Sequence, residues 1–358
     1  MKQAVPCADG AAEASASAGY RRLLLRRTAC LASLALALGW AFAVDLATGP
    51  AALGWRDVVT GWLQPDRLAP EMWVIIHEIR VPYALMAVVV GGALGLAGAE
   101  MQTALDNPLA SPFTLGIGAA ATLGASLVIV FGLGSGLARE FALPLAAFLF
   151  AAAACGLLLV VARALGPALH TLVLFGIALL FGLNALVGAL QFVADADALQ
   201  QIVFWTLGSL ARASMERVGM VGAVLLVCLA FAMRQAWALT ALRGGEDHAR
   251  SLGLRVERLR TMALLRVSLL TGVATAFVGE IGFVGLVGPH IARLLLGEDH
   301  RFLLPGSVLA GALLLSLASV ASRAVLPGVI LPVGLVTALI GVPLFIALIV
   351  SRGRQGGA

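Results

Sequence analysis

The segment VPYALMAVVVGGALGLAGAEMQTA, residues 81–104, decides the fold class of this chain. A membrane-spanning helix needs about 20 apolar residues, and Glu100 is the single formally charged side chain in this run. Gly91, Gly95 and Ala99 recur every four residues, a spacing that lets helix backbones approach closely in a membrane. The segment therefore predicts a transmembrane helix with close neighbours, and a hinge at the glycines is the less favoured alternative.

The same pattern recurs along the chain. Further apolar stretches lie at residues 28–48, 113–133, 142–162, 171–194, 215–233, 263–279, 281–297, 303–322 and 331–350. Of the 358 residues, 61% are hydrophobic and 12% are charged, which leaves too little polar surface for a water-soluble globule. We therefore predict an all-α, polytopic membrane protein with about ten transmembrane helices. The stretch at 281–297 is short, so a tight turn or a re-entrant bend can precede it.

The two ends of the chain set its orientation. Arginines 21, 22, 26 and 27 precede the first apolar run, as in a signal peptide, but the length of that run favours an uncleaved first span. We divide the chain into a cytoplasmic tail at 1–27, a transmembrane domain at 28–350 and a cytoplasmic tail at 351–358. With both termini in the cytoplasm, most of the arginines fall on the cytoplasmic side, as the positive-inside rule requires.

Several functions are excluded by composition. Lys2 is the only lysine, so a phosphate-binding loop that ends in Gly-Lys-Ser/Thr cannot be written and the chain cannot hydrolyse ATP by such a loop. Cys7, Cys30, Cys155 and Cys228 lack metal-ligand spacing, so we expect no metal site. The arginines punctuate apolar runs and form no basic face, which favours contact with membrane lipid over nucleic acid. We therefore expect no catalytic residue, no bound cofactor and no metal.

Polar residues inside the spans are few. A carrier coupled to protons or sodium ions usually keeps ionisable groups near the bilayer midplane, whereas most of these lie near span ends. An ion-coupled carrier is therefore an alternative of lower rank, and Glu100 is interpreted as a snorkelling or hydrogen-bonded structural acid. The candidates are Glu100, Asn184, Gln191, Glu280, His290 and Arg293.

One cytoplasmic loop differs from the others. Residues 245–260 read GEDHARSLGLRVERLR. Glu246 and Asp247 suit the first turn of a helix that stops at Gly253, and a second short basic helix can follow at 254–260. Two short helices on the cytoplasmic side would form a docking knob, and an ordinary solvated loop is the alternative.

Five segments resemble the FecCD family, the permease subunits of type II ATP-binding-cassette (ABC) importers that move iron-siderophores, haem and cobalamin. The segments are RVPYALMAVVVGGALGLAGAEMQTALDNPLASPFTLGIG (80–118), DALQQIVFWTLGSL (197–210), GEDHARSLGLRVERLR (245–260), GEIGFVGLVGPHIARLLLGEDHRFLLPG (279–306) and LPVGLVTALIGVPLFI (331–346). They follow family order over nearly all of the chain after its N-terminal tail.

The resemblance implies a type II importer permease fold and a set of partners. These are a second copy of the chain, two ATP-binding subunits that use the ATP, and a periplasmic binding protein, all at the bacterial inner membrane. NPLASPFTLGIG (107–118) looks most like iron-siderophore permeases, so a ferric siderophore is the expected cargo, with haem or cobalamin as the alternative. The implied ATPase-coupling residues are Glu246, Asp247, Ala249, Arg250, Leu252 and Gly253.

Two arginines are the implied contacts of the binding protein. Arg80 precedes the second span and Arg323 ends the ninth, so both are expected at the periplasmic mouth, where positive-inside statistics disfavour arginine. A guanidinium suits bidentate pairing with a carboxylate of a partner. Many relatives carry a second arginine where this chain has Tyr83, which leaves that contact open.

Overall fold

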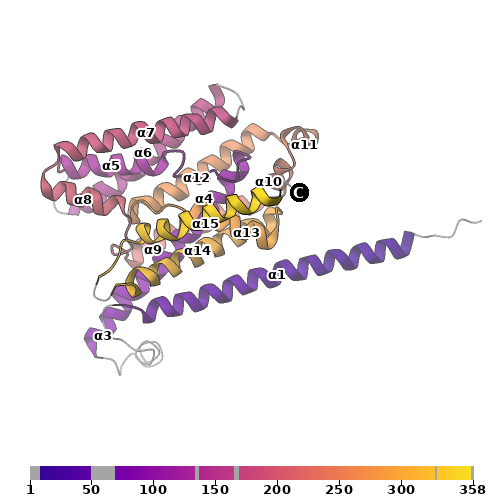
Figure 1. Ribbon diagram of the computed structural model, residues 1–358, viewed down its shortest axis with the longest axis horizontal. Coiled ribbons are helices and arrows are strands. Elements are labelled where there is room, and N and C mark those ends of the chain that lie inside the picture. Colours follow the sequence, from indigo (N-terminus) through magenta and orange to yellow (C-terminus); the bar gives the residue numbers. More distant parts are fainter. Residues whose placement is uncertain (1–8, 50–68, 134–136, 165–168, 327–328, 356–358) are drawn as a thin grey trace, which may run out of the picture.

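The structure is a computed structural model that describes residues 9–49, 69–133, 137–164, 169–326 and 329–355. Within these ranges all regular structure is helical (Figure 1). The helices are α1 Asp9–Ala47, α3 Pro70–Val74, the π-helical η2 Ile75–Arg80, α4 Val81–Ala104, α5 Ile117–Val130, α6 Leu137–Ala164, α7 Leu169–Val193, α8 Ala196–Thr206, α9 Met215–Arg234, α10 Ala236–Arg243, α11 Glu246–Ser251, α12 Val256–Val278, α13 Val284–Leu296, α14 His300–Ala324 and α15 Val333–Gln355.

The ten apolar stretches of the sequence all form helices. Among the described residues, seven helical segments are long and apolar enough to cross a membrane: Gly19–Ala47, Pro70–Ala104, Phe141–Val161, Leu172–Val193, Met215–Arg234, Val256–Val278 and His300–Ala324. Three shorter apolar helices, Ile117–Val130, Val284–Leu296 and Val333–Ile346, account for the other stretches. The predicted all-α polytopic fold is confirmed.

Helix α4 lies at the centre of the bundle, against α14, α12 and α13. A Cβ atom on Gly95 would lie 2.1 Å from the carbonyl oxygen of Ser307, and one on Gly98 would lie 1.6 Å from that of Gly285. A Cβ atom on Gly91 would meet α14 at 2.5 Å. Only glycine fits at such distances, so the small residues of α4 serve close backbone packing, as the sequence predicted.

The first and last helices extend into the two segments that were predicted as tails. Helix α1 runs without a break from Asp9, so most of the segment 1–27 is helical, and α15 continues past residue 350 to Gln355. Alanine is frequent at residues 11–18, and its high helix propensity carries α1 beyond the apolar run. Residues 1–8 and 356–358 lie outside the described residues. The first residues of α1 and the last of α15 lie toward the end of the bundle that carries α11 (Figure 1).

A tight turn separates α12 from α13, as the short apolar stretch predicted. Gly279 has φ +76° and Phe283 has φ +66°. A Cβ atom on Gly279 would lie 2.2 Å from the carbonyl oxygen of Trp205, so the turn packs directly on the end of α8. The following helix, α13, has 13 residues, and at 1.5 Å per residue it is about 20 Å long, less than a hydrocarbon core of about 30 Å.

Candidate functional site

Helix α11 projects beside α10 at one end of the bundle (Figure 1). Glu246 and Asp247 occupy its first turn, where the positive end of the helix dipole favours acids, as predicted. Ala249 is fully buried, whereas Leu252 keeps 46% of its surface exposed. One face of α11 therefore packs against the rest of the protein, and the apolar side chain of Leu252 after it is exposed.

Helix α11 ends at the glycine that the sequence marked. The backbone N–H of Leu254 donates to the carbonyl of Ala249 (3.1 Å), and the N–H of Gly253 donates to that of Arg250 (2.9 Å). Gly253 has φ +79°, so these bonds form a Schellman motif with glycine in the left-handed position. The predicted helix stop is present.

The second short helix predicted at 254–260 does not exist as a separate element. Helix α12 begins at Val256 and continues into the membrane, because neither glycine nor proline interrupts residues 256–271. The knob is therefore one short helix joined by a tight turn to a spanning helix.

Ion pairs hold α11 against α12 and α4. Arg260 on α12 pairs with Glu246 (2.5 Å) and donates from Nε to the carbonyl of Ala104 at the end of α4 (2.9 Å). Arg250 pairs with Glu246 and with Glu257, each at 3.0 Å. The hydrogen bond to Glu257 raises the pKa of Arg250. Exposed pairs contribute little energy one by one, so their main effect here is to set the orientation of α11.

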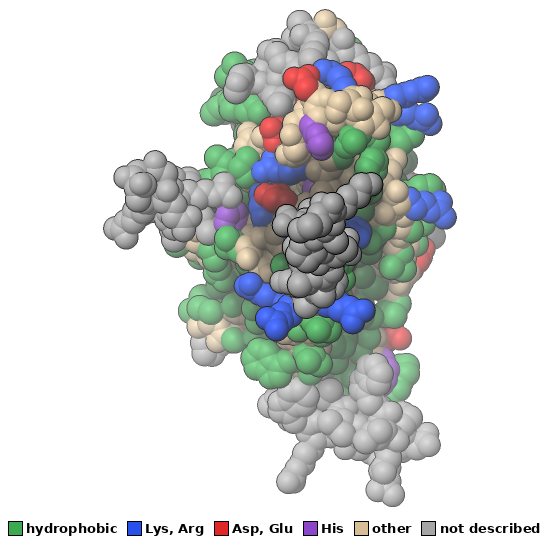
Figure 2. Space-filling view, turned by 90° about the vertical axis from the view of Figure 1, so that its right-hand side faces the viewer, with side chains coloured by type: hydrophobic (Ala, Val, Ile, Leu, Met, Phe, Trp, Pro, Cys, Tyr) green, Lys and Arg blue, Asp and Glu red, His purple; other side chains and the backbone are tan. Residues whose placement is uncertain are grey.

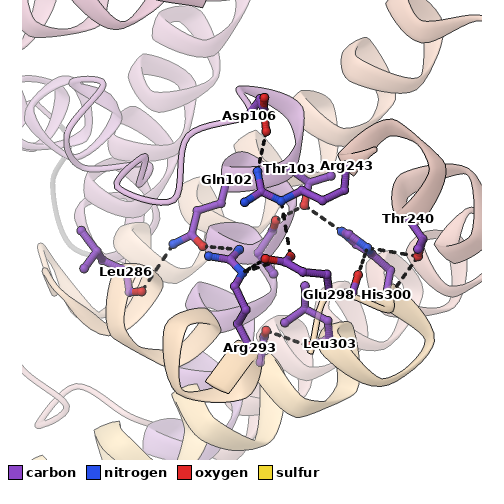
Figure 3. Close-up of polar contacts among 12 residues, drawn as sticks. Gln102, Thr103, Asp106, Thr240, Arg243, Leu286, Arg293, Glu298, His300 and Leu303 are labelled. Atoms are coloured by element: carbon purple, nitrogen blue, oxygen red, sulfur yellow. Dashed lines mark hydrogen bonds and ion pairs between the residues drawn. The ribbon is translucent and has the colours of Figure 1, made fainter. Parts of the chain in front are cut away.

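A second set of contacts joins α10 to the C-terminal end of α4 (Figure 3). Arg243, the last residue of α10, contacts Asp106 in the loop after α4 (Nη1–Oδ1 2.5 Å) and Glu298 (3.3 Å). Glu298 also pairs with Arg293 of α13 (3.1 Å), and Arg293 donates to the amide oxygen of Gln102 on α4 (3.0 Å). Three helices thus share one charged network.

His300 completes this link and is fully buried. Its Nε2 lies 2.7 Å from the hydroxyl of Thr103 on α4, and its Nδ1 lies 3.2 Å from the hydroxyl of Thr240 on α10 (Figure 3). Sequence reasoning missed this bridge, although His300 lies in the quoted segment 279–306. The sequence did contain one indication, because His300 is a polar residue at the start of a helix within the segment that resembles the family.

The N-terminal part of α1 is fastened at the same end. Arg27 pairs with Asp299 (3.2 Å) and lies 5.3 Å from the ring centre of Phe302. Asp299 also accepts from Arg301 (2.8 Å), and this hydrogen bond is the main cause that lowers the pKa of the carboxyl. Figure 2 shows the molecule from the end that carries α11, where basic and acidic side chains are interspersed.

Arg80 and Arg323 lie at the other end of α1. Arg80 is 4% exposed and donates to the carbonyl of Leu46 (2.8 Å). Arg323 pairs with the buried Asp45 and donates to the carbonyl of Thr48 (2.7 Å). Both guanidinium groups thus satisfy the C-terminal carbonyls of α1, a position that favours cations.

The structure therefore corrects the expected exposure of these two arginines. They lie at the end opposite α11, as predicted, but their side chains are engaged within the chain. Tyr83 belongs to the same cluster, since the guanidinium carbon of Arg323 lies 4.6 Å from the centre of its ring. A direct contact with a binding protein requires Arg80 and Arg323 to leave these partners.

Glu100 is a paired structural acid and does not snorkel. It is fully buried on α4 and accepts from Nε of Arg266 on α12 at 2.8 and 3.0 Å, with a further contact from Nη2. Arg266 is deeper in its helix than the sequence implied, because α12 begins before the apolar stretch does. The hydrogen-bonded alternative of the sequence interpretation is thus the one observed.

These features define a class of protein. Apolar spanning helices surround α4, and a short helix projects from one end and is tied by ion pairs to α12. Within the described residues, no three potential metal ligands of the His, Cys, Asp or Glu type lie together. This is the architecture of a polytopic membrane permease.

Comparison with known proteins agrees with this class. The model of the FecCD transport family matches residues 35–351, so the chain belongs to the FecCD transport family. It is 37% identical over 321 residues to the hemin transport system permease of Yersinia pestis. This aligned region covers 87% of this chain and 94% of the relative. It is also 37% identical over 294 residues to the vitamin B12 import system permease of Vibrio cholerae, covering 81% of this chain and 87% of the relative.

A solved structure shows the same fold. It is described as a metal-chelate type ABC transporter in an inward-facing conformation, with a TM-score of 0.79 and 30% identity over 90% of this chain and 98% of the other. The chain is therefore the permease subunit of an ABC importer, a transport subunit without catalytic activity. ATP hydrolysis resides in a separate subunit, and importers of this kind work with ATPase and binding-protein partners.

Proposed function

We propose that this chain forms the translocation path for a ferric siderophore across the bacterial inner membrane. It would act as a homodimer with two ATP-binding subunits and a periplasmic binding protein, with both termini in the cytoplasm. The observation that carries the proposal is α11, held by Glu246, Arg250 and Arg260 on a spanning helix of a FecCD permease. Two copies present two such helices, which matches two ATP-binding subunits.

The contacts of α10 and α11 suggest how ATP hydrolysis is coupled to the path. Motion of α11 reaches α12 through the turn at Gly253, and motion of α10 reaches α4 through Arg243 and the bridge at His300. The coupling residues Glu246, Asp247, Ala249, Arg250, Leu252 and Gly253 keep their proposed role in this scheme. Ala249 and Gly253 shape the helix, and the exposed Leu252 offers an apolar contact to the ATPase.

At the other end we propose that Arg80 and Arg323 act on binding-protein docking. The structure supports an indirect action, because both arginines hold the end of α1, and the segment after α1 begins there. Pairing of these arginines with acidic residues of the binding protein then requires exchange of partners at Asp45.

Haem or cobalamin is the second candidate cargo. The observation that favours it is the 37% identity with hemin and vitamin B12 permeases over most of the chain. An ion-coupled carrier is less favoured, since the buried acid Glu100 is neutralised by Arg266.

The test is uptake of labelled chelates into proteoliposomes that contain the permease and its two partners. The panel comprises ferric siderophores, haem and cobalamin. We expect ATP-dependent uptake of a ferric siderophore that requires both partner proteins. Uptake of haem or cobalamin alone would reassign the cargo, and uptake driven by an ion gradient without ATP would refute the proposed function.

A further inference from the structure

The loop between α8 and α9, residues 207–214, lies toward the end of the bundle away from α11 (Figure 1). Two cavities flank this loop. Their volumes are about 490 Å³ and about 600 Å³. Ala211 and Arg212 border both of them. The smaller one, here called the entry cavity, lies against α8 and residues 330–332 before α15.

The loop that carries Arg212 is fixed by its backbone. The N–H of Ser209 donates to the carbonyl of Val278 at the end of α12 (2.7 Å). Gly208 has φ +65°, and a Cβ atom there would lie 2.4 Å from the carbonyl oxygen of Glu280. The loop after α8 therefore packs tightly against the end of α12, and Arg212 follows this packed segment.

Polar groups line this otherwise apolar cavity. They include Gln200, Gln201, Ser209 and Arg212. Trp205 also lines it and is only 3% exposed, yet its indole N–H has no hydrogen-bond partner among the described residues. That nitrogen exposes almost no surface, so it is not open to the cavity and Arg212 is the charged group that a ligand would meet.

Arg212 lacks an acidic counterpart. None of the ion pairs in the described part of the chain includes it. Arg212 is exposed, and partial loss of water together with the like charge of Arg217 lowers the pKa of its guanidinium. Arg217 also donates to the carbonyl of Arg212 (2.6 Å), which keeps the two residues adjacent. The residues that line the entry cavity include Arg212 and no acidic side chain, an environment that favours an anion.

We propose that the entry cavity binds the anionic part of the transported chelate, with Arg212 as the anion-binding group and Gln200 and Ser209 as polar neighbours. This inference rests on the proposed function and narrows its substrate class to chelates that carry carboxylate or similar anionic groups. A volume of about 490 Å³ lies within the range of about 300–1,000 Å³ typical of small-molecule sites. The cavity therefore holds the charged portion of such a chelate at the start of the path.

The experiment compares anionic with neutral chelates in proteoliposomes that contain the complete transporter. The probes are ferric citrate and haem, which are anionic, and ferrichrome and cyanocobalamin, which are neutral. The variants are Arg212→Gln, Arg212→Lys and Arg217→Gln. Arg217 is the matched control because it borders the larger cavity and not the entry cavity. Basal ATP hydrolysis with the ATPase subunit checks that each variant is folded and coupled.

We expect the wild type to take up an anionic chelate. Loss of a charge-assisted hydrogen bond of about 1.5–3 kcal/mol corresponds to roughly a 10- to 100-fold change. Arg212→Gln should therefore raise the half-saturating concentration at least about tenfold, Arg212→Lys should restore part of it, and Arg217→Gln should stay within about twofold. An equal loss in Arg217→Gln, or no loss in Arg212→Gln, would overturn the site. ATP-dependent uptake of ferrichrome alone would overturn the inference and leave the proposed function standing, whereas no uptake of any probe would count against both.

Discussion

The buried pair of Glu100 and Arg266 allows a quantitative prediction about how α4 and α12 stay together. Replacing Glu100 with Gln keeps the size of the side chain and removes its charge, which leaves Arg266 buried without a counterion. Glu100 is fully buried, and the side chain of Arg266 is only 10% exposed. Removing one partner of a buried ion pair costs about 3–5 kcal/mol, so we expect a loss of about 3 kcal/mol in the free energy of unfolding. That is roughly a 100-fold change in the ratio of folded to unfolded protein.

A double-mutant cycle measures the interaction directly. The free energy of unfolding is determined for Glu100→Gln, Arg266→Gln and the double variant in mixed micelles titrated with a denaturing detergent. The double variant buries no charge at these positions, so it should lose less than the sum of the two single variants, by about 1.5 kcal/mol or more.

Glu257→Gln is the matched control on α12, because its side chain is 73% exposed. It should change the free energy of unfolding by no more than about 0.5 kcal/mol. Additive losses in the cycle, or a change in Glu100→Gln as small as that of the control, would refute the view that this ion pair joins α4 to α12.

Further predictions concern the knob, the end of α1, the acid dependence and the ATPase. Gly253→Val should uncouple ATP hydrolysis from uptake while membrane insertion persists, because the left-handed conformation at this position costs about 1–2 kcal/mol for a residue other than glycine. Gly253→Asn should have a milder effect. Normal transport in the valine variant would contradict the role of this turn. Arg323→Ala should lower the thermal stability of the detergent-solubilised protein, because the buried Asp45 loses its counterion; unchanged stability with weakened binding-protein docking would favour a direct contact instead. The pKa of Asp299 is lowered in the folded state, so its stabilising effect is present above its unfolded pKa and is lost as the pH falls through the folded value; Asp299→Asn should flatten this part of a pH–stability profile, and an unchanged profile would contradict it. The purified chain alone should hydrolyse no ATP, since its only lysine is Lys2, and turnover that survives removal of contaminating ATPases would disprove this.

Much of the fold could be predicted because the membrane imposes a local requirement. Each span needs about 20 apolar residues, so the ten stretches are visible without knowledge of their neighbours. The stop of α11 at Gly253 and the acids in its first turn were also predictable, since a helix end depends on a few adjacent residues. The bounds of α1 and α12 were not, because helix propensity and packing carry both helices beyond their apolar runs.

The candidate site was only partly predictable from the sequence. The short helix at 246–251 was predicted, and its coupling role stays a prediction. The contacts of α10 with the end of α4 were not predictable, because Arg243 contacts Asp106 and His300 contacts Thr103. The separations of 137 and 197 residues hide these pairs from any local pattern. Arg80 and Arg323 were placed at the correct end, but the sequence could not show that α1 covers them.

The sequence by itself determined that this chain is a polytopic helical membrane protein with a short helix that stops at Gly253 and no phosphate-binding loop of the Gly-Lys-Ser/Thr type. Tertiary structure alone decided which polar groups meet: Glu100 with Arg266, and Asp45 with Arg323, across 166 and 278 residues. The physical reason is the near-uniform apolarity of the spans. Helix α4 is buried on nearly all sides, so periodicity cannot tell which face meets which neighbour. In the bilayer that choice depends on close backbone contacts and on pairing of the few polar side chains.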